Sequence, residues 1–537
     1  MAAAVVVGAF LRLDQFTAQV LIDDEWHAVH QVLRKTPAEL LLDFGYADYS
    51  IPLGLLYWFE ARWFGLSESL MRAPMLLCGL ATLVAFPLYV ARRMSRATAL
   101  TFAFLLALSP LLVIYSRMAR PYAITLLLGW VAHVAFQRWH TQADARAAPA
   151  FAYGAAATLA TWLHPIVGPF VLAPFLWGAW QLRHAAPALR RARFVRLAKL
   201  ALATGAVIAA LVLPPLIANP HSMALKSGID MPNLGTAVGV WYAWLGTPST
   251  LVVLACVALA VYGAADVAAA LPEARTGLLG ILLTLVAVLA TRPMWSYNPI
   301  ALARYLLPVV PLLLLGVAAG AVKLARRVAV PGTTLRRGVV AAGIAALPCV
   351  ALAAQSPLVP LLRHPNGQAL HFMYHFDFRD GHNPYLPHFE AIPLSPFWAG
   401  LAAQPPGSVR IAAAPFYFES FNWDAPRWEA VSRQAIVPGF LTGLCSAWRG
   451  GEVPQESGFR LRNAVHLAAV VRGAGGVDYV VWQKPYTRTT AGGTETIGSE
   501  TANCEAVLRA RLGPPAYEDA TLVAFDVRAQ ARTDAAR

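Results

Sequence analysis

Long apolar runs separated by short polar stretches dominate the first two thirds of this sequence. A helix needs roughly 17–25 apolar residues to cross a bilayer. The first run is too short to span alone, so we expect residues 13–16, or residues upstream of Met1, to complete it; neither a basic start nor a cleavage site marks it as a signal peptide. The pattern predicts about eleven spans, near residues 1–12, 70–91, 97–115, 121–138, 150–163, 165–182, 198–218, 249–269, 277–291, 304–322 and 338–354.

The pattern changes after about residue 355, where long apolar runs stop and Pro, Asp, Glu and aromatic residues become frequent. Alternating and helical periods now follow each other over short distances, which is typical of a soluble α/β domain. The fold class expected is therefore a polytopic α-helical membrane protein over residues 1–354, followed by a soluble α/β domain over 355–537. Strands are predicted near 408–418, 477–483 and 521–528, and helices near 461–473 and 504–513.

Composition supports the membrane assignment and argues against nucleic acid as a partner. Hydrophobic residues make up 58% of the chain and charged residues only 13%, about half the share of a soluble protein. The net charge of +14 would suit nucleic acid, but the Lys and Arg residues gather in short runs between apolar segments. That distribution follows the positive-inside rule and predicts membrane lipids, not nucleic acid, as partners. It places Met1 in the cytoplasm, and the first loop and the C-terminal domain outside.

The first external loop, residues 13–69, is long and acidic. Asp23, Asp24 and Glu25 follow the first apolar run, and Asp48 lies in YADYSIPLGLLYW. The stretch EWHAVHQVL has a helical period and is expected to lie on the membrane surface, which would hold Asp24 and Glu25 at the interface. A solvated loop is the competing explanation for any single one of these acids.

Arginines also occur on the external side, against the usual bias. Arg117 and Arg120, with Tyr122, lie in LSPLLVIYSRMARPYAITLLL, and Arg304 with Tyr305 opens a later span. Guanidinium groups bind phosphate oxygens bidentately and keep their charge. Snorkelling to lipid headgroups is the alternative.

His164 precedes a proline at the same external boundary. A single histidine there is more often a helix-end hydrogen-bonding group than a catalyst. Taken together, external acids, arginines and this histidine fit a site for an anionic, lipid-borne substrate.

Two features of the C-terminal part leave alternatives open. Cys445 and Cys504 are its only cysteines, and an oxidising compartment would allow a disulfide, although spacing alone does not establish its geometry. His371 and His375 have a spacing that can chelate a metal on a helix. FMYHFDF could equally be a strand, however, and for the surrounding segment, residues 363–390, we favour an aromatic and polar surface over the active site.

Four short segments, in order, resemble motifs of the GT-C membrane glycosyltransferases. LRLDQFTAQVLIDDEWHAV resembles the opening of that family, with an arginine-containing stretch before an Asp-Glu pair. FGLSESLMRAP resembles F-G-x-S-E-x-x-x-R-x-P, SPLLVIYSRMARPY resembles S-P-x-x-x-x-x-S-x-x-x-R-x-Y, and RYLLPVVP resembles R-Y-L-x-P-x-x-P. The likeness covers roughly residues 10–320 and is to the protein O-mannosyltransferase-like (family 39-like) group, which includes the lipid A aminoarabinose transferases. One departure is Asp48-Tyr-Ser-Ile-Pro52, where the family often has D-H-P-P.

The resemblance implies the chemistry. The donor would be a sugar on a polyprenyl phosphate such as undecaprenyl phosphate, and the acceptor a hydroxyl of a lipid, protein or glycan at the periplasmic face of a bacterial inner membrane. Asp24 matches the acid that serves as general base. Glu25 would orient the acceptor or help bind a divalent ion such as Mg²⁺ or Mn²⁺, and Asp48 is a second acidic candidate.

In this scheme the arginines would stabilise the leaving phosphate, with Tyr122 and Tyr305 beside them, and His164 would position donor or acceptor. Displacement would be single and inverting.

Two other functions compete with this one. A transporter or flippase for lipid-linked sugars should show internal repeats and charges near the middle of the bilayer, whereas the charges here gather at the outer ends of spans. A scaffold with a degenerate membrane part would not need Asp24, Arg120 and Arg304 at their motif positions.

Overall fold

The structure of the protein is a computed structural model. It describes residues 1–14, 16–17, 25, 28–29, 31–32, 35–44, 50–141, 147–184, 186–224, 226–228, 230–328, 333–356, 358, 394–414, 428, 431–438, 440–442, 464–466, 477–490, 493–497 and 502–528.

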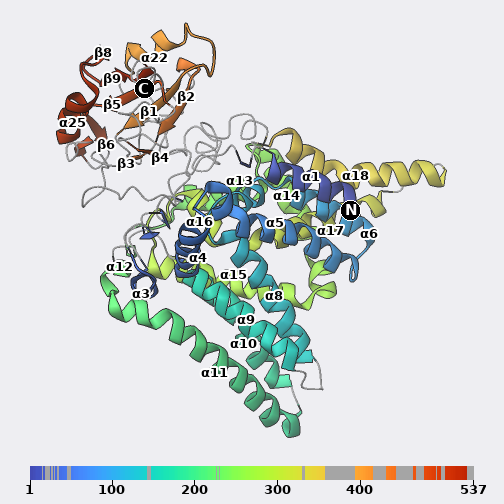
Figure 1. Ribbon diagram of the computed structural model, residues 1–537. Coiled ribbons are helices and arrows are strands. Elements are labelled where there is room, and N and C mark those ends of the chain that lie inside the picture. Colours follow the sequence, from blue (N-terminus) through green and yellow to red (C-terminus); the bar gives the residue numbers. More distant parts are fainter. Residues whose placement is uncertain are drawn as a thin grey trace.

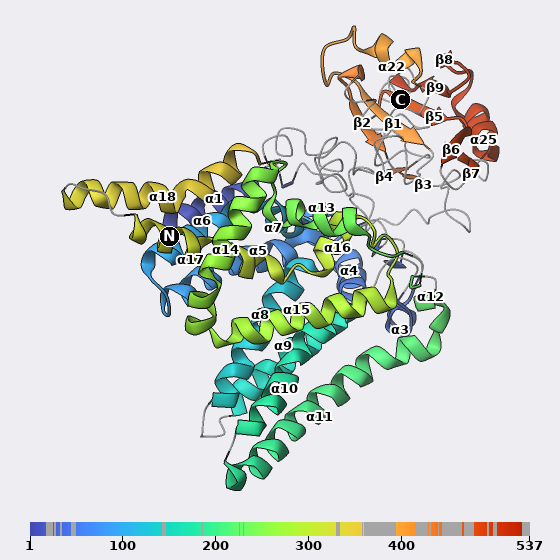
Figure 2. The same ribbon diagram turned by 180° about the vertical axis from the view of Figure 1, so that it is seen from behind.

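Helices form at each of the predicted apolar runs, and the membrane part is a bundle of them (Figures 1 and 2). Among the described residues, seven helices are long and apolar enough to cross a membrane, or eight if a bent pair counts as one span. The polytopic helical class is therefore confirmed. The helices are α1 (Ala2–Leu13), α5 (Glu68–Ala91), α6 (Arg96–Leu108), α7 (Pro110–Ser116), α8 (Tyr122–Thr141), α9 (Ala147–Leu163), α10 (Gly168–Gln181), α11 (Pro187–Ala218), α14 (Thr250–Ala270), α15 (Pro272–Thr291), α17 (Val309–Arg327) and α18 (Thr334–Ala354).

Two predicted spans differ in detail. The run at 97–115 bends by 59° between α6 and α7, because Pro110 cannot continue the hydrogen bonding of α6. The run at 304–322 begins only at Val309, and Arg304 lies instead in a separate short helix, α16 (Pro299–Tyr305). Both breaks place short helices next to the predicted external arginines.

Further short helices connect the spans. In the first loop they are α3 (Pro37–Leu41) and α4 (Ile51–Trp63), and later α12 (Pro220–Ala224) and α13 (Leu234–Leu245). Helix α3 is fixed by a capping box, in which Thr36 Oγ1 accepts from the Glu39 amide and the Glu39 carboxylate accepts from the Thr36 amide. The expected surface helix in EWHAVHQVL lies largely outside the described residues.

Helices α14 and α17 pack side by side through glycines. A Cβ added to Gly320 would come within 1.9 Å of the Leu259 carbonyl oxygen, and one on Gly263 within 2.4 Å of the Gly316 carbonyl oxygen. Because apolar side chains gain little by leaving lipid for a helix interface, close backbone approach at small residues holds such helices together.

The C-terminal domain contains a mixed five-stranded sheet (orange to red in Figure 1) in the order β2-β1-β5-β9-β8. Strand β1 runs parallel to β2 and β5, and β9 runs antiparallel to β5 and β8. Smaller ladders pair β3 with β4 and β6 with β7. The bounds are β1 (Arg410–Ala414), β2 (Ala435–Pro438), β3 (Phe440–Thr442), β4 (Ala464–His466), β5 (Tyr479–Gln483), β6 (Tyr486–Thr490), β7 (Gly493–Ile497), β8 (Tyr517–Glu518) and β9 (Leu522–Asp526), with helices α22 (Pro396–Leu401) and α25 (Ala502–Leu512).

The predicted strands at 408–418, 477–483 and 521–528 contain β1, β5 and β9, and the helix predicted at 504–513 is α25. The helix predicted at 461–473 is wrong where that segment is described, because Ala464–His466 pairs in parallel with β3. Strand pairing here overrides a helical period.

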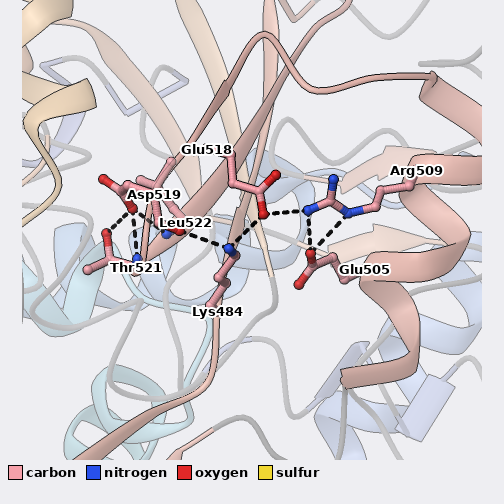
Figure 3. Close-up of polar contacts among 7 residues, drawn as sticks. All are labelled: Lys484, Glu505, Arg509, Glu518, Asp519, Thr521 and Leu522. Atoms are coloured by element: carbon pink, nitrogen blue, oxygen red, sulfur yellow. Dashed lines mark hydrogen bonds and ion pairs between the residues drawn. The ribbon is translucent and has the colours of Figure 1, made fainter.

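Asp519 holds the turn between β8 and β9 (Figure 3). Its Oδ1 accepts from the Thr521 amide at 2.7 Å, the Thr521 hydroxyl at 2.7 Å and the Leu522 amide at 2.9 Å. Burial opposes ionisation, but these bonds and one from Ser395 outweigh it and hold the pKa of Asp519 far below its usual range. Lys484 extends the network by donating to the Asp519 carbonyl at 2.8 Å, and Glu518 joins it through Lys484 and Arg509.

We expect Gly320→Ala to destabilise the membrane bundle by about 1–3 kcal/mol or more, since a methyl group must displace backbone of α14. Gly343→Ala is the matched control, because nothing lies within 4 Å of its added Cβ. Thermal unfolding of the full chain in detergent should show a lower Tm for the first variant only. Equal melting points would mean that the two helices are not packed through Gly320.

We expect Asp519→Asn to loosen the β8–β9 turn at pH 7. Because the pKa of Asp519 is lowered, its stabilisation is fully present above the usual Asp value of about 3.9 and is lost as the pH falls below it. Hydrogen exchange of residues 522–526 should be faster in the variant at pH 7, and the difference should shrink in acid. Glu505→Gln, at the half-exposed pair with Arg509, should change exchange little.

Candidate active site

Arg117 and Arg120 lie in the tight turn that joins α7 to α8. Both are buried, with 3% and 4% of their surface exposed. Within the turn the Arg120 amide donates to the Met118 carbonyl at 2.7 Å. Charged groups buried to this extent need fixed polar partners, and the turn has such partners.

Glu25 and Arg72 form a buried ion pair that holds this turn. Arg72 Nε and Nη2 donate to Glu25 Oε1 and Oε2 at 2.7 and 2.5 Å, and both side chains are fully buried. Glu25 Oε1 also accepts from the Ala119 amide at 2.6 Å. A two-pronged arginine–carboxylate contact fixes orientation as well as distance. One carboxylate therefore ties the first loop, α5 and the arginine turn together.

Tyr57 of α4 supports the same point. Its hydroxyl lies 3.1 Å from the Met71 carbonyl oxygen and 3.5 Å from that of Ala119. Helix α4, the start of α5 and the arginine turn thus meet at one buried position.

Arg117 is directed at helix α1. Its Nη1 donates to the carbonyl oxygens of Leu11 and Asp14, at 3.1 and 2.7 Å. The last carbonyls of a helix have no partner within it and carry partial negative charge, so a cation is favoured there. Arg12, in the last turn of α1, also connects this helix to α7 by donating to the Ser116 hydroxyl at 3.3 Å. Arg117 was expected to bind phosphate, and in this geometry that nitrogen caps a helix.

The remaining predicted residues come together beside the turn. The His164 ring lies 5.4 Å from that of Tyr122, edge to face, and 6.0 Å from that of Tyr305, stacked at 15°. The Arg304 guanidinium carbon lies 5.7 Å from the Tyr122 ring and 5.6 Å from the Tyr305 ring. Arg120 lies two residues before Tyr122, at the end of the same turn. We call Arg120, Tyr122, His164, Arg304 and Tyr305 the arginine–aromatic cluster.

The cluster joins positions far apart in the sequence and is mostly buried. Tyr122 and His164 are each 3% exposed and Tyr305 is 7% exposed. Like charges repel more strongly in a low-dielectric setting than in water. An anion placed between Arg120 and Arg304 would relieve this repulsion, and its attraction to both arginines would be stronger there than in water.

Helix α16, which carries Arg304 and Tyr305, is fixed at its start. Asn298 Oδ1 accepts from the Ile300 amide at 2.9 Å as an N-cap. The loop before it contains Trp295 with a φ of 67°, a left-handed conformation that costs energy for a non-glycine residue. Asp230 holds that loop by accepting from the Trp295 amide.

Several predicted site residues lie outside the description. Asp24, Asp48, Cys445, and the pair His371 and His375 are not among the described residues. Cys504 belongs to α25, but its side chain is also outside them. The disulfide, and the aromatic and polar surface or its metal-binding alternative at 363–390, therefore stay predictions. Within the described part of the chain, no group of three or more His, Cys, Asp or Glu side chains could hold a metal ion.

Arg72 is the functional residue that sequence reasoning missed. It lies inside FGLSESLMRAP, a segment that resembles a family motif but does not by itself predict a role for this arginine. The available signal was an arginine in an apolar span, which needs a partner. That its partner is Glu25, 47 residues earlier, follows only from the fold.

No family model and no curated protein matches the sequence. Among solved structures, ArnT from Cupriavidus metallidurans matches in its apo state with 13% identity and a TM-score of 0.44, covering 99% of this chain and 98% of that one. The same protein bound to undecaprenyl phosphate matches with 14% identity and a TM-score of 0.45, covering 98% and 97%.

Arabinosyltransferase EmbB from Mycobacterium smegmatis matches with 14% identity and a TM-score of 0.43, covering 78% of this chain and 48% of that chain. These structures fall in the class that the sequence motifs resemble, the GT-C membrane glycosyltransferases. At this level of likeness, no residue's role is transferred from them.

We expect Glu25→Gln to destabilise the protein by about 3–5 kcal/mol, because it leaves the buried charge of Arg72 uncompensated. Lys323→Gln is the control; it removes one partner of the part-exposed pair with Asp266, which should cost at most about 1 kcal/mol. The measurement is the Tm of each full-length variant. In a double-mutant cycle, Glu25→Gln with Arg72→Gln should lose clearly less than the two single losses added. Additive losses would show that the pair is not coupled.

Proposed function

We propose that this protein is an integral membrane glycosyltransferase that moves a sugar from a polyprenyl phosphate to an acceptor hydroxyl at the external membrane face. The observation that carries the proposal is the placement of Arg304 over the rings of Tyr122 and Tyr305. His164 lies against both rings, and Arg120 lies two residues before Tyr122. These residues lie in the α7–α8 turn, at the start of α8, before α10 and on α16. Together they form one positively charged, aromatic region at the ends of helices.

The proposed donor fits the arginine–aromatic cluster in two ways. Its phosphate would lie between Arg120 and Arg304, whose N–H groups match phosphate oxygens in pairs. Its polyprenyl chain would remain in lipid. When the bond from the anomeric carbon to the phosphate oxygen breaks, negative charge grows on that oxygen, and fixed cations stabilise this change.

The proposed general base is Asp24. It directly precedes Glu25, whose carboxylate is bound to Arg72 and to the Ala119 amide. Anchoring Glu25 brings that part of the first loop to the arginine turn. Asp24 would take the acceptor's proton as its oxygen attacks the anomeric carbon from the face opposite the phosphate, so a single displacement inverts the configuration.

Other residues receive supporting roles in this proposal. Glu25, with both oxygens in the ion pair with Arg72, and Arg117, which caps α1, are positioning residues. The His164 ring lies against those of Tyr122 and Tyr305, and it would hydrogen-bond the sugar donor or the acceptor molecule. Asp48 stays a candidate for placing the acceptor. A divalent ion, Mg²⁺ or Mn²⁺, would need carboxylates such as Asp24 and Asp48, and no step here is routed through it.

The proposed topology puts this site outside and the basic ends of the same helices inside. Helix α17 follows Arg304 at its start and carries Arg326 and Arg327 in its last turn. Helix α8 starts at Tyr122 and ends with Arg138 and His140. Both therefore run from the proposed external face to a basic, cytoplasmic face, as the positive-inside rule requires.

We expect Arg304→Gln to lower kcat/KM for a polyprenyl-phosphate sugar by about 10²–10³-fold, the usual cost of removing one group that stabilises developing charge. Asp24→Asn should lose transfer while still binding the donor lipid. Arg326→Gln, which is exposed at the opposite end of α17, is the control and should keep full activity. The measurement is transfer from radiolabelled polyprenyl-phosphate sugars to membrane extract by the purified full chain.

The outcomes separate the competing functions. Transfer that needs Asp24 and Arg304 supports the glycosyltransferase. Movement of a labelled lipid across a vesicle without any transfer would support a flippase instead. A fully active Asp24→Asn variant would remove the base from the mechanism.

A further inference from the structure

A basic cleft lies at the opposite end of α8 from the arginine–aromatic cluster. It has a volume of about 810 Å³ and is lined by Trp139 of α8 and by Arg191, Arg196 and Lys199 of α11, together with Ala192, Val195 and Leu200. From Tyr122 to Trp139, α8 rises about 26 Å at 1.5 Å per residue. The cleft is therefore almost a bilayer thickness away from the proposed catalytic site.

One side of the cleft is rigid. Arg196 donates to the Trp139 carbonyl oxygen at 2.8 Å, and its guanidinium carbon lies 4.5 Å from the centre of the Trp139 ring. The ring is buried, so this arginine is held by both a hydrogen bond and a cation–π contact. Arg191 and Lys199 extend from the same helix and are exposed. No hydrogen bond or ion pair ties either of them to another described residue.

The position of the cleft along α11 matches that of a membrane surface. The helix has 32 residues, or about 48 Å, whereas the hydrocarbon core is about 30 Å thick. Its first part therefore extends past the apolar region, and all its basic residues lie there, up to Lys199. The rings of Trp177 and Trp180 lie 4.9 Å apart, tilted by 36°, near the same end, as in the aromatic belts of membrane proteins. Figure 1 shows α11 running along α9 and α10.

The two ends of α11 offer different chemistry to one ligand. Residues 182–199 contain five arginines and one lysine but no Asp or Glu. Farther along, apolar side chains face outward, for example Leu202 with 74% of its surface exposed. A ligand with an anionic head and long apolar chains would fit both parts. The positive-inside rule accounts for the charge of this segment. It does not account for Arg196 being held against the buried Trp139 in a cleft that Arg191 and Lys199 also line.

We propose that this cleft binds the phosphate headgroup of an anionic phospholipid, with the acyl chains lying along the apolar face of α11. The headgroup phosphate meets Arg191, Arg196 and Lys199, and Trp139 forms the wall beside it. Basic pockets between membrane helices are a recurring site for such lipids. The site is independent of the sugar-transfer proposal and does not use its residues.

The test is native mass spectrometry of the full chain in detergent, titrated with dioleoyl phosphatidylglycerol, with dioleoyl phosphatidylcholine, or with inorganic phosphate. We expect phosphatidylglycerol to bind best. Arg191→Gln/Lys199→Gln should weaken that binding about tenfold or more, since each basic residue near the surface adds to lipid affinity. The matched control, Arg183→Gln/Arg193→Gln, removes two exposed charges from the same segment outside the cleft and should change affinity less than about twofold.

A second variant separates shape from charge. Arg196→Lys keeps the charge but loses the planar group over Trp139, and its affinity should fall between wild type and the double variant. Equal weakening by both double variants would show diffuse attraction and overturn the site. Equal binding of phosphatidylcholine, or inorganic phosphate binding as tightly as the lipid, would overturn the anionic-lipid assignment.

Discussion

The membrane part of this protein depends on one carboxylate that makes three hydrogen bonds out of contact with water. Glu25 accepts twice from Arg72 and once from the Ala119 amide. Through these bonds the first loop, the start of α5 and the turn between α7 and α8 hold one another in place. A buried ion pair adds little net stability when complete but costs much when broken. Its main effect is therefore to fix geometry, and here it fixes the turn that carries Arg117 and Arg120.

Broken helices provide the second constraint. Pro110 separates α7 from α6, and Asn298 starts α16 just ahead of the long span α17. A continuous helix would have carried these arginines along its side into lipid. Short helices instead end at the arginines and present backbone and side chains to the interior, where irregular backbone is tolerated because it is buried in protein. Arg304 reaches the rings of Tyr122 and Tyr305 from the second break, and Arg120 lies two residues before Tyr122, in the turn that follows the first break.

The sequence predicted the class and much of the arrangement, because apolar runs report directly on helices in lipid. Each run is helical, although the runs at 97–115 and 304–322 are each divided between two helices, and the strands β1, β5 and β9 lie where alternation placed them. The sequence also predicts that Arg120, Tyr122, His164, Arg304 and Tyr305 share one site, because cations on the outer side of a membrane protein are uncommon and imply a purpose.

What could not be predicted depends on pairings between distant segments. Arg117 has the same residue type and nearly the same setting as Arg120, yet it caps α1. Arg72 and Glu25 look unrelated in the chain. The segment 461–473 has a helical period, yet Ala464–His466 within it pairs with β3. The choice between helix and strand there depends on a partner strand and not on the local pattern.

The central claim is that Arg120 and Arg304 form one phosphate site held by the Glu25–Arg72 pair. The most direct measurement is an experimental structure of the full chain with a polyprenyl phosphate bound. The account predicts phosphate oxygens about 3 Å from guanidinium nitrogens of both arginines, with Glu25 still paired to Arg72. A phosphate bound away from Arg120 and Arg304, or a Glu25 released from Arg72 to contact the ligand, would contradict it.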